Sequence, residues 1–187
     1  LTLRQADATD GTPPTPPKPT PTRVADASET LGLDFRHDEN DFIDFNRERL
    51  APHKLSTEGP ALAVADVNAD GRDDVFVGGA KWQTPRLYLQ NADGRFAVAD
   101  TAVFEETART EDVDAAFFDA DSDGDPDLYV VSGGGEFWGM ADALRDRLYL
   151  NDGRGGFTRA PDALPESFVT NGGTVAPGDA DGDGDVD

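Results

Sequence analysis

The sequence predicts an all-β repeat protein, and three observations lead to this prediction. An Asp-rich loop recurs with apolar segments on both sides, and an apolar hairpin recurs between the loops. Gly and Pro are also frequent, with 20 and 13 copies in 187 residues. Such a composition favours short strands and turns over long helices. Self-similarity at a regular interval indicates a repeat architecture.

The repeated unit contains four predicted strands. The Asp-rich loops start at residues 66, 119 and 179, which are 53 and 60 residues apart, and in the first two copies an apolar strand follows that ends in Gly-Gly. Residues 87–96 and 148–157 each carry Leu-Tyr-Leu and Phe on either side of an Asp-Gly turn, which predicts a β-hairpin. Four strands in 53 to 61 residues are the content of one propeller blade. We therefore predict four-stranded antiparallel blades in a partial β-propeller of about two to three blades.

The chain divides into three parts. Ten residues of Pro, Thr and Lys dominate the middle of residues 1–23, so this part is predicted to be an extended Pro/Thr-rich linker. Residues 24–58, here called the lead-in segment, are expected to form a strand or hairpin because Asp41–Phe45 is rich in apolar residues. Residues 59–187 hold the repeats, with boundaries at 59–115, 116–174 and the start of a third at 175–187. The stretch Glu136 to Arg147 is expected to be a surface excursion with a short helical turn.

Charge excludes several kinds of partner. The formal net charge of −22 argues against nucleic acid, and no run of 18 apolar residues exists that could insert into a membrane. There is no Cys, so no disulfide framework is predicted. Asp supplies 29 of the 38 acidic residues, and about half of them fall in the three loops. The acidity therefore reflects both a solvated surface and a set of metal ligands.

Each loop carries oxygen-bearing side chains at positions 1, 3, 5 and 9 and Gly at position 6. Alternate spacing lets a tightly curled backbone direct several oxygens at one centre, and position 7 adds a main-chain carbonyl. Hard oxygen ligands suit Ca²⁺, and the absence of His and Cys from the loops disfavours zinc and copper. We predict two to three Ca²⁺ ions, with the third loop incomplete. The predicted ligands are Asp66, Asn68, Asp70, Arg72 and Asp74 in the first loop, Asp119, Asp121, Asp123, Asp125 and Asp127 in the second, and Asp179, Asp181, Asp183, Asp185 and Asp187 in the third.

An EF-hand begins with the same pattern but is excluded on two grounds. It needs an acidic residue at position 12 and helices on both sides. Position 12 is Val77 in the first loop and Val130 in the second. The residues that follow both loops are β-branched and aromatic, which favours strands.

These motifs resemble the FG-GAP or VCBS repeats of bacterial surface proteins and of the integrin α-chain propeller. The resemblance covers roughly residues 59–187 and rests on the loops, the Gly-Gly strand ends and the hairpins. It implies a seven- or eight-bladed propeller in which Ca²⁺ serves mainly the structure. The chain departs from the family in extent, because it holds about two blades and the start of a third. We therefore expect an open arc that needs a partner.

The expected function is binding and not catalysis. His37 and His53 are the only imidazoles and are expected to be solvated, so we expect no enzyme, no catalytic residues and no organic cofactor. Trp82 and Trp138 are either loop-packing residues or platforms for a glycan. We expect a binding, adhesion or scaffold module, located outside the cell, at its surface or in the periplasm. Its partner would be a protein, a glycan, or further copies or segments of the same protein. The alternatives are a part of a secreted polysaccharide-degrading enzyme and a structural subunit of a surface filament or matrix.

Overall fold

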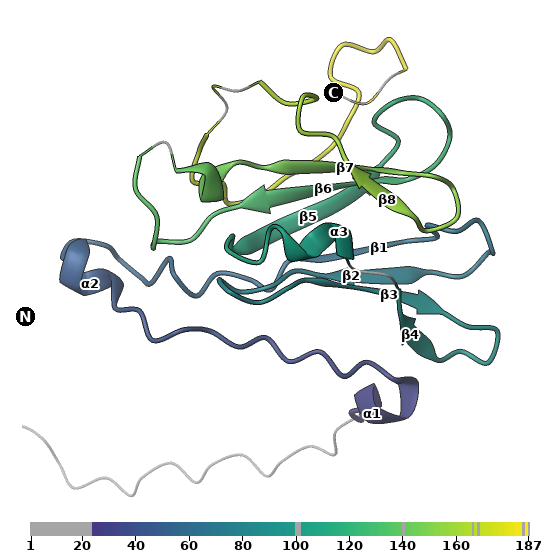
Figure 1. The fold of residues 1–187 in the computed structure, drawn as a ribbon, viewed down its shortest axis with the longest axis horizontal. Coiled ribbons are helices and arrows are strands. Elements are labelled where there is room, and N and C mark those ends of the chain that lie inside the picture. Colours follow the sequence, from purple (N-terminus) through teal and green to yellow (C-terminus); the bar gives the residue numbers. More distant parts are fainter. Residues whose placement is uncertain are drawn as a thin grey trace, which may run out of the picture.

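Two four-stranded antiparallel sheets pack face to face in the computed structural model (Figure 1). The structure describes residues 24–99, 102–139, 141–165, 167, 169–184 and 186. Each sheet has its strands in chain order, as a propeller blade does, and this confirms the predicted fold class. Blade 1 consists of β1 (Leu62–Ala65), β2 (Asp74–Val77), β3 (Arg86–Gln90) and β4 (Phe96–Val98); blade 2 consists of β5 (Asp112–Phe118), β6 (Asp127–Ser132), β7 (Arg147–Asn151) and β8 (Phe157–Arg159).

The strand registers of the two blades match. The Asp-rich loops close the first strand pair of each blade, because Ala65 pairs with Asp74 and Phe118 pairs with Asp127. Both predicted hairpins form at the last strand pair, where Gln90 lies opposite Phe96 and Asn151 lies opposite Phe157. The Asp-rich loops and the hairpins therefore occupy equivalent places in the two blades.

The hydrophobic core lies between the blades. Blade 1 contributes Ala63, Phe76 and Leu87, and blade 2 contributes Leu128 and Tyr149, among others. The short helix α3 (Ala102–Glu105), which the sequence did not predict, connects the blades and inserts Phe104 between them. The Phe104 ring meets Phe76 and Tyr149 edge to face, with centroid distances of 5.6 and 5.0 Å. Burial of these rings holds the two blades together.

The predicted strand or hairpin in the lead-in segment is wrong. Residues 24–58 are all described, and their only regular elements are two single-turn helices, α1 (Ser28–Leu31) and α2 (Asp44–Arg47). Asp44 is the physical reason. Its buried carboxylate accepts hydrogen bonds from the backbone amides of Leu55 and Ser56 (both 3.1 Å) and from the Ser56 hydroxyl (2.5 Å). The chain therefore folds back on itself here and forms no strand.

The lead-in segment runs along blade 1 before it reaches β1 (Figure 1). The Tyr88 hydroxyl donates to the carboxylate of Asp34 at 2.8 Å, and Arg86 donates to the same oxygen at 2.9 Å. At the equivalent place in blade 2, the hydroxyl of Tyr149 lies 3.2 Å from that of Thr107. The lead-in segment thus supplies a hydrogen-bond partner for Tyr88 in blade 1, as the connection between the blades supplies Thr107 for Tyr149 in blade 2.

The Gly-Gly strand ends have a steric cause. A Cβ atom at Gly78 would lie 2.6 Å from the Cβ of Asp112 and 2.8 Å from that of Ala61. A Cβ atom at Gly133, the equivalent residue of blade 2, would lie 2.6 Å from the carbonyl oxygen of Gly172. The backbone of the following repeat therefore passes close to the end of the second strand in both blades.

The start of the third repeat lies against blade 2. The amide of Gly172 donates to the Ser132 carbonyl, and the amide of Val175 donates to the Asp114 carboxylate, both at 3.0 Å. The described residues after 165 contain no strand, and the predicted linker, residues 1–23, lies outside the described residues. The predicted helical turn is present as a 3₁₀ helix, η2 (Asp142–Leu144), although Arg147 after it is buried. None of the helices in the described ranges combines the length and apolar character needed to cross a bilayer.

Candidate metal sites

The three Asp-rich loops share one backbone turn. In each, the position-1 carboxylate accepts a hydrogen bond from the amide of the position-6 Gly, which has a left-handed backbone. This bond curls the loop around its first carboxylate. The distances are 2.7 Å for Asp66 and Gly71, 2.9 Å for Asp119 and Gly124, and 3.0 Å for Asp179 and Gly184.

Position 4 of each loop is also left-handed, which the sequence analysis did not predict. The φ angles are 56° at Ala69, 63° at Ser122 and 81° at Gly182. A non-Gly residue at positive φ is uncommon, so the first two loops contain a conformation that local preference disfavours. Gly182, at this position in the third loop, was the sequence feature that could have indicated the left-handed conformation.

In the first two loops, the position-9 carboxylate connects the loop to the next hairpin. Asp74 accepts from the amides of Val67 (3.2 Å) and Gln90 (2.7 Å), and Asp127 accepts from the amides of Ala120 and Asn151 (both 2.8 Å). Both side chains are fully buried. Gln90 and Asn151 were not predicted to matter, although both directly follow Leu-Tyr-Leu in the repeated hairpin.

The second loop brings three carboxylates together. Oxygens of Asp119, Asp121 and Asp127 all lie within 4.8 Å of one another. Burial raises the pKa of Asp121, and the nearby carboxylates of Asp123 and Asp127 raise it further. Asp125 is turned away from this group and lies against the hairpin, where a Cβ atom at Gly153 would be 2.3 Å from its Oδ2. A divalent cation would neutralise this concentration of charge.

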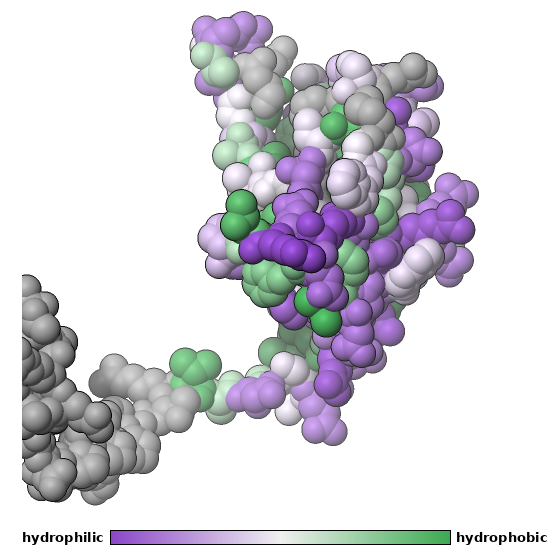
Figure 2. All heavy atoms as spheres, turned by 90° about the vertical axis from the view of Figure 1, so that its left-hand side faces the viewer, coloured by the Kyte–Doolittle hydropathy of each residue, from purple (hydrophilic) through white to green (hydrophobic). Residues whose placement is uncertain are grey.

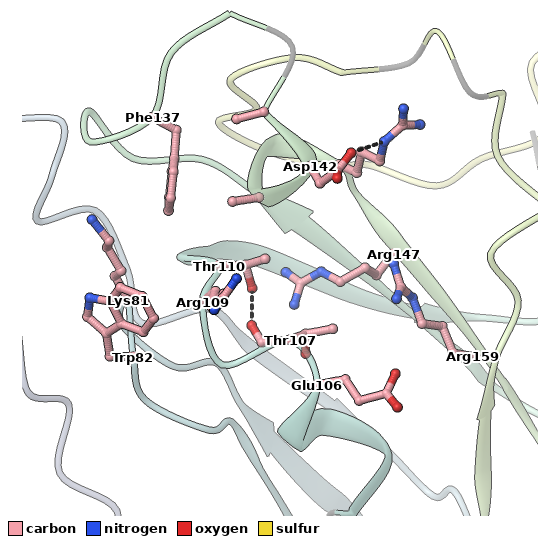
Figure 3. A pocket seen from close by; sticks show the side chains of 13 residues that line it. Lys81, Trp82, Glu106, Thr107, Arg109, Thr110, Phe137, Asp142, Arg147 and Arg159 are labelled. Atoms are coloured by element: carbon pink, nitrogen blue, oxygen red, sulfur yellow. Dashed lines mark hydrogen bonds and ion pairs between the residues drawn. The ribbon is translucent and has the colours of Figure 1, made fainter.

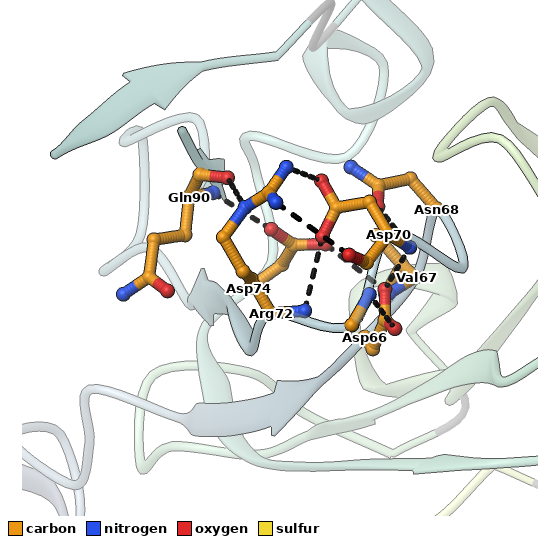
Figure 4. Close-up of polar contacts among 8 residues, drawn as sticks. Asp66, Val67, Asn68, Asp70, Arg72, Asp74 and Gln90 are labelled. Atoms are coloured by element: carbon orange, nitrogen blue, oxygen red, sulfur yellow. Dashed lines mark hydrogen bonds and ion pairs between the residues drawn. The ribbon is translucent and has the colours of Figure 1, made fainter. Parts of the chain in front are cut away.

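The first loop contains its own cation (Figure 4). Arg72 forms an ion pair with Asp70, and its Nε donates to the carbonyl of Gln90 at 2.9 Å. Burial raises the pKa of Asp74, and the carboxylates of Asp70 and Asp66 add to the shift. In the part of the chain that the structure describes, no three acidic side chains of this loop gather as closely as those of the second loop.

The third loop gathers the carboxylates of Asp179, Asp181 and Asp183 within 4.8 Å, all on exposed side chains. The other two predicted ligands, Asp185 and Asp187, lie outside the described residues. The donor sets of the second and third loops consist of oxygen alone and fit a hard cation such as Ca²⁺ better than zinc or copper.

The two imidazoles lie away from the loops, in the lead-in segment. His53 is exposed, as expected, but His37 is not: its side chain is 14% exposed, and its Nε2 lies 2.6 Å from Glu39. The expectation of a solvated His37 is therefore wrong, because the segment folds back against the blades. Trp82 and Trp138 are 63% and 73% exposed, so neither indole is mainly a packing residue.

Comparison with known proteins identifies the same repeats. A family model described as FG-GAP-like repeat matches residues 66–130 and 119–187, about two thirds of the chain. Each match begins at the first Asp of a metal loop and runs into the loop of the next repeat. No curated protein matches the chain. The repeats, the blades and the loops together place the chain in the FG-GAP-like repeat family.

Proposed function

We propose that the chain is a calcium-stabilised segment of an extracellular β-propeller that acts as a non-catalytic binding or scaffold module. The observation that carries the proposal is the group of Asp119, Asp121 and Asp127, whose oxygens lie within 4.8 Å of one another in a loop that recurs along the chain. Without a cation, such a group is destabilised by mutual repulsion. A bound Ca²⁺ would convert this repulsion into a cross-link.

The position of the second loop explains why calcium would stabilise the blade. Asp127 already joins the loop to β7 through the amide of Asn151. An ion held by Asp127 together with Asp119 and Asp121 would connect β5, β6 and β7 at one point. Calcium sites in extracellular modules have dissociation constants near 10⁻⁴ to 10⁻³ M, which suits the calcium concentration outside cells.

The exposed face of blade 1 is an argument for a binding partner. Leu62 and Val64 of β1 are 60% and 52% exposed, whereas Ala115, which occupies the place of Leu62 in blade 2, is 8% exposed against blade 1. Blade 1 therefore presents the kind of face that a neighbouring blade covers elsewhere in the molecule. We assign this face to a further segment or copy of the same protein.

Calorimetric titration of Ca²⁺ into chelator-treated protein tests the proposal. We expect binding that raises the melting temperature, and we expect the variant carrying both Asp119→Asn and Asp121→Asn to lose the site in the second loop. Asp93→Asn, in the hairpin of blade 1, is the matched control and should bind as the unaltered chain does. Absence of calcium binding, together with a melting temperature that does not respond to chelator, would refute the proposal.

A further inference from the structure

A cationic pocket lies between the blades at the end opposite the metal loops, where β2 and β6 end. Figure 2 looks onto this end, on which hydrophilic residues predominate. The cavity has a volume of about 610 Å³, within the range of ligand-binding sites. Its lining includes two acidic side chains, Glu106 and Asp142, and five cationic ones, in a chain whose net charge is −22. The cationic side chains are Lys81, Arg109, Arg145, Arg147 and Arg159.

Arg147 extends into this pocket from the start of β7 (Figure 3). Its side chain is 1% exposed, and its Nη2 donates to Asp112 at 2.6 Å and to the Ser132 hydroxyl at 3.1 Å. Its Nε and Nη1 are buried and have no hydrogen-bond partner of ordinary geometry among the described residues, although the side chain of Tyr149 also interacts with the guanidinium. Buried donors without acceptors are costly, so this guanidinium is arranged to receive oxygen atoms from a ligand.

Arg159 adds a second incompletely paired guanidinium. Its Nε is also buried without a partner, and it forms no ion pair within the described part of the chain. Lys81 and Arg145, by contrast, are paired with Glu136 and Asp142. The buried donors without acceptors in the pocket therefore belong to Arg147 and Arg159, while Arg109, which also forms no ion pair among the described residues, lies beside the Trp82 ring. Two guanidinium groups suit a planar oxyanion such as a carboxylate.

Trp82 gives the pocket an aromatic edge. Its backbone is left-handed (φ 72°), and its amide donates to the Ala108 carbonyl at 2.6 Å. This conformation is an outlier for a bulky residue, yet the indole that it positions is 63% exposed. Lys81 and Arg109 lie 5.7 and 5.8 Å from the ring centroid. A strained backbone that presents an exposed indole beside cations indicates a ligand-contacting role.

We infer that this pocket binds an acidic sugar, with the carboxylate toward Arg147 and Arg159 and the ring against the indole of Trp82. An apolar sugar face packs on an aromatic ring, and the guanidinium groups bind the carboxylate. The net charge of the chain repels polyanions, so the ligand is a short or sparsely charged glycan. This inference rests on the proposed role as a binding module, but not on calcium.

Titration of a galacturonate disaccharide into the intact chain, followed by calorimetry and Trp fluorescence, tests the inference. We expect Arg159→Gln and Trp82→Ala each to weaken binding about tenfold, because each removes one of the two contacts. The methyl ester of the disaccharide should bind about tenfold more weakly for the same reason. Arg95→Gln, on the hairpin of blade 1, is the matched control and should leave the affinity unchanged. Circular dichroism would verify that each variant is folded.

Arg147→Lys is a second variant that keeps a cation beside Asp112 but removes the guanidinium fork. It should weaken binding of the disaccharide even where circular dichroism shows that the variant is folded. Inorganic sulfate binding as tightly as the disaccharide, with no effect of Trp82→Ala, would overturn the sugar assignment. Absence of disaccharide binding to the folded chain would overturn the inference as a whole. Calcium titration of the same sample separates the two ideas, because a chain that binds calcium but no disaccharide refutes only the pocket.

Discussion

The first and second metal loops have the same backbone turn but differ at their seventh position. Arg72 in the first loop pairs with Asp70 and donates to the carbonyl of Gln90. Asp125 in the second loop lies against Gly153 and leaves three other carboxylates facing one another. The formal side-chain charge is −3 in residues 66–74 and −5 in residues 119–127. One repeat pattern therefore produces one loop that is partly neutralised by its own Arg72 and one whose acidic side chains form no ion pair among the described residues.

This contrast extends to the rest of the two blades. The face of blade 2 that contacts blade 1 is buried, whereas on the equivalent face of blade 1 the lead-in segment covers Tyr88 and leaves Leu62 and Val64 exposed. The carboxylate of Asp112, the first residue of β5, lies beside the end of β2 and is paired with Arg147. Its neighbour Glu111 lies beside Gly134, after the end of β6, and has a buried oxygen without a partner among the described residues. Equivalent positions in a repeat protein thus differ in energy because their neighbours differ.

The largest expected effect concerns the two blade faces. Ala115→Asp should destabilise the chain by about 4 kcal/mol, because it buries a charge against blade 1. Leu62→Asp, at the equivalent position of blade 1, should change stability by no more than about 0.5 kcal/mol. Urea unfolding of both variants measures the difference. Equal damage from both would mean that the face of blade 1 is covered in solution, and light scattering would then show an oligomer.

The next prediction compares how the two position-9 carboxylates, Asp74 and Asp127, contribute to stability with and without calcium. Asp74→Ala and Asp127→Ala should each cost about 3 kcal/mol in chelator, because each leaves two buried amides without acceptors. A filled site adds about 2.7 kcal/mol at a hundredfold excess of ligand over the dissociation constant. Asp127→Ala should lose this calcium-dependent gain, and Asp74→Ala should keep most of it. Equal calcium dependence of the two variants would contradict the contrast between the loops.

Glu111 should make stability depend on pH. Burial raises the pKa of Glu111 from 4.5 to about 8, and Glu39, Glu136 and Glu58 add to the shift. Because the folded chain keeps a proton that the unfolded chain has lost, stability should fall as the pH rises from about 4.5 to about 8 and then level off.

Glu111→Gln should remove this fall. The variant should therefore gain on the unaltered chain by an amount on the order of 2 kcal/mol between pH 5 and pH 9. Melting temperatures across that range measure the gain, and the exposed Glu48→Gln is the control. A difference that does not vary with pH would show that Glu111 is ionised in the folded chain.

The smallest effect comes from exchanging the seventh positions. Arg72→Asp should tighten calcium binding at the first loop by about fivefold, because it removes a competing cation, and Asp125→Arg should weaken the second loop by a similar factor. Calorimetric titration of both variants measures the change. If neither variant changes affinity, the two loops differ for a reason other than the charge at this position.

The repeat made the blades and most of the loop geometry predictable. Strand-forming residues flank the first two loops in the sequence, and the registers at Asp74 and Asp127 follow from their shared spacing. The lead-in segment was not predictable in this way, since it occurs once and its fold depends on the contact of Asp44 with Ser56. The spacing of motifs predicts the elements that repeat. A contact that occurs once, between residues that lie apart in the sequence, leaves no such pattern.

The candidate sites show the same division. Gly at position 6 and the oxygen-bearing side chains could be predicted from spacing, and the structure places Asp119, Asp121 and Asp127 together. The burial of Arg147 was not predictable, because the stretch from Glu136 to Arg147 lengthens the spacing between repeats and was therefore expected to be a surface excursion. Its neighbours Asp112 and Ser132 come from two other strands, β5 and β6.

The side chain of Asn151 gives the two loops a shared element. Its Nδ2 donates to the carbonyl of Val67 in the first loop (2.9 Å) and to that of Pro126 in the second (3.1 Å), while its backbone amide donates to the carboxylate of Asp127. An ion that tightens either loop therefore acts on the same amide group. Where the two loops are coupled through this side chain, thermodynamic linkage makes the effect of each loop's occupancy on the affinity of the other equal in both directions. Asn151 of blade 2 thus holds the loop of its own blade and the loop of the neighbouring blade at the same time.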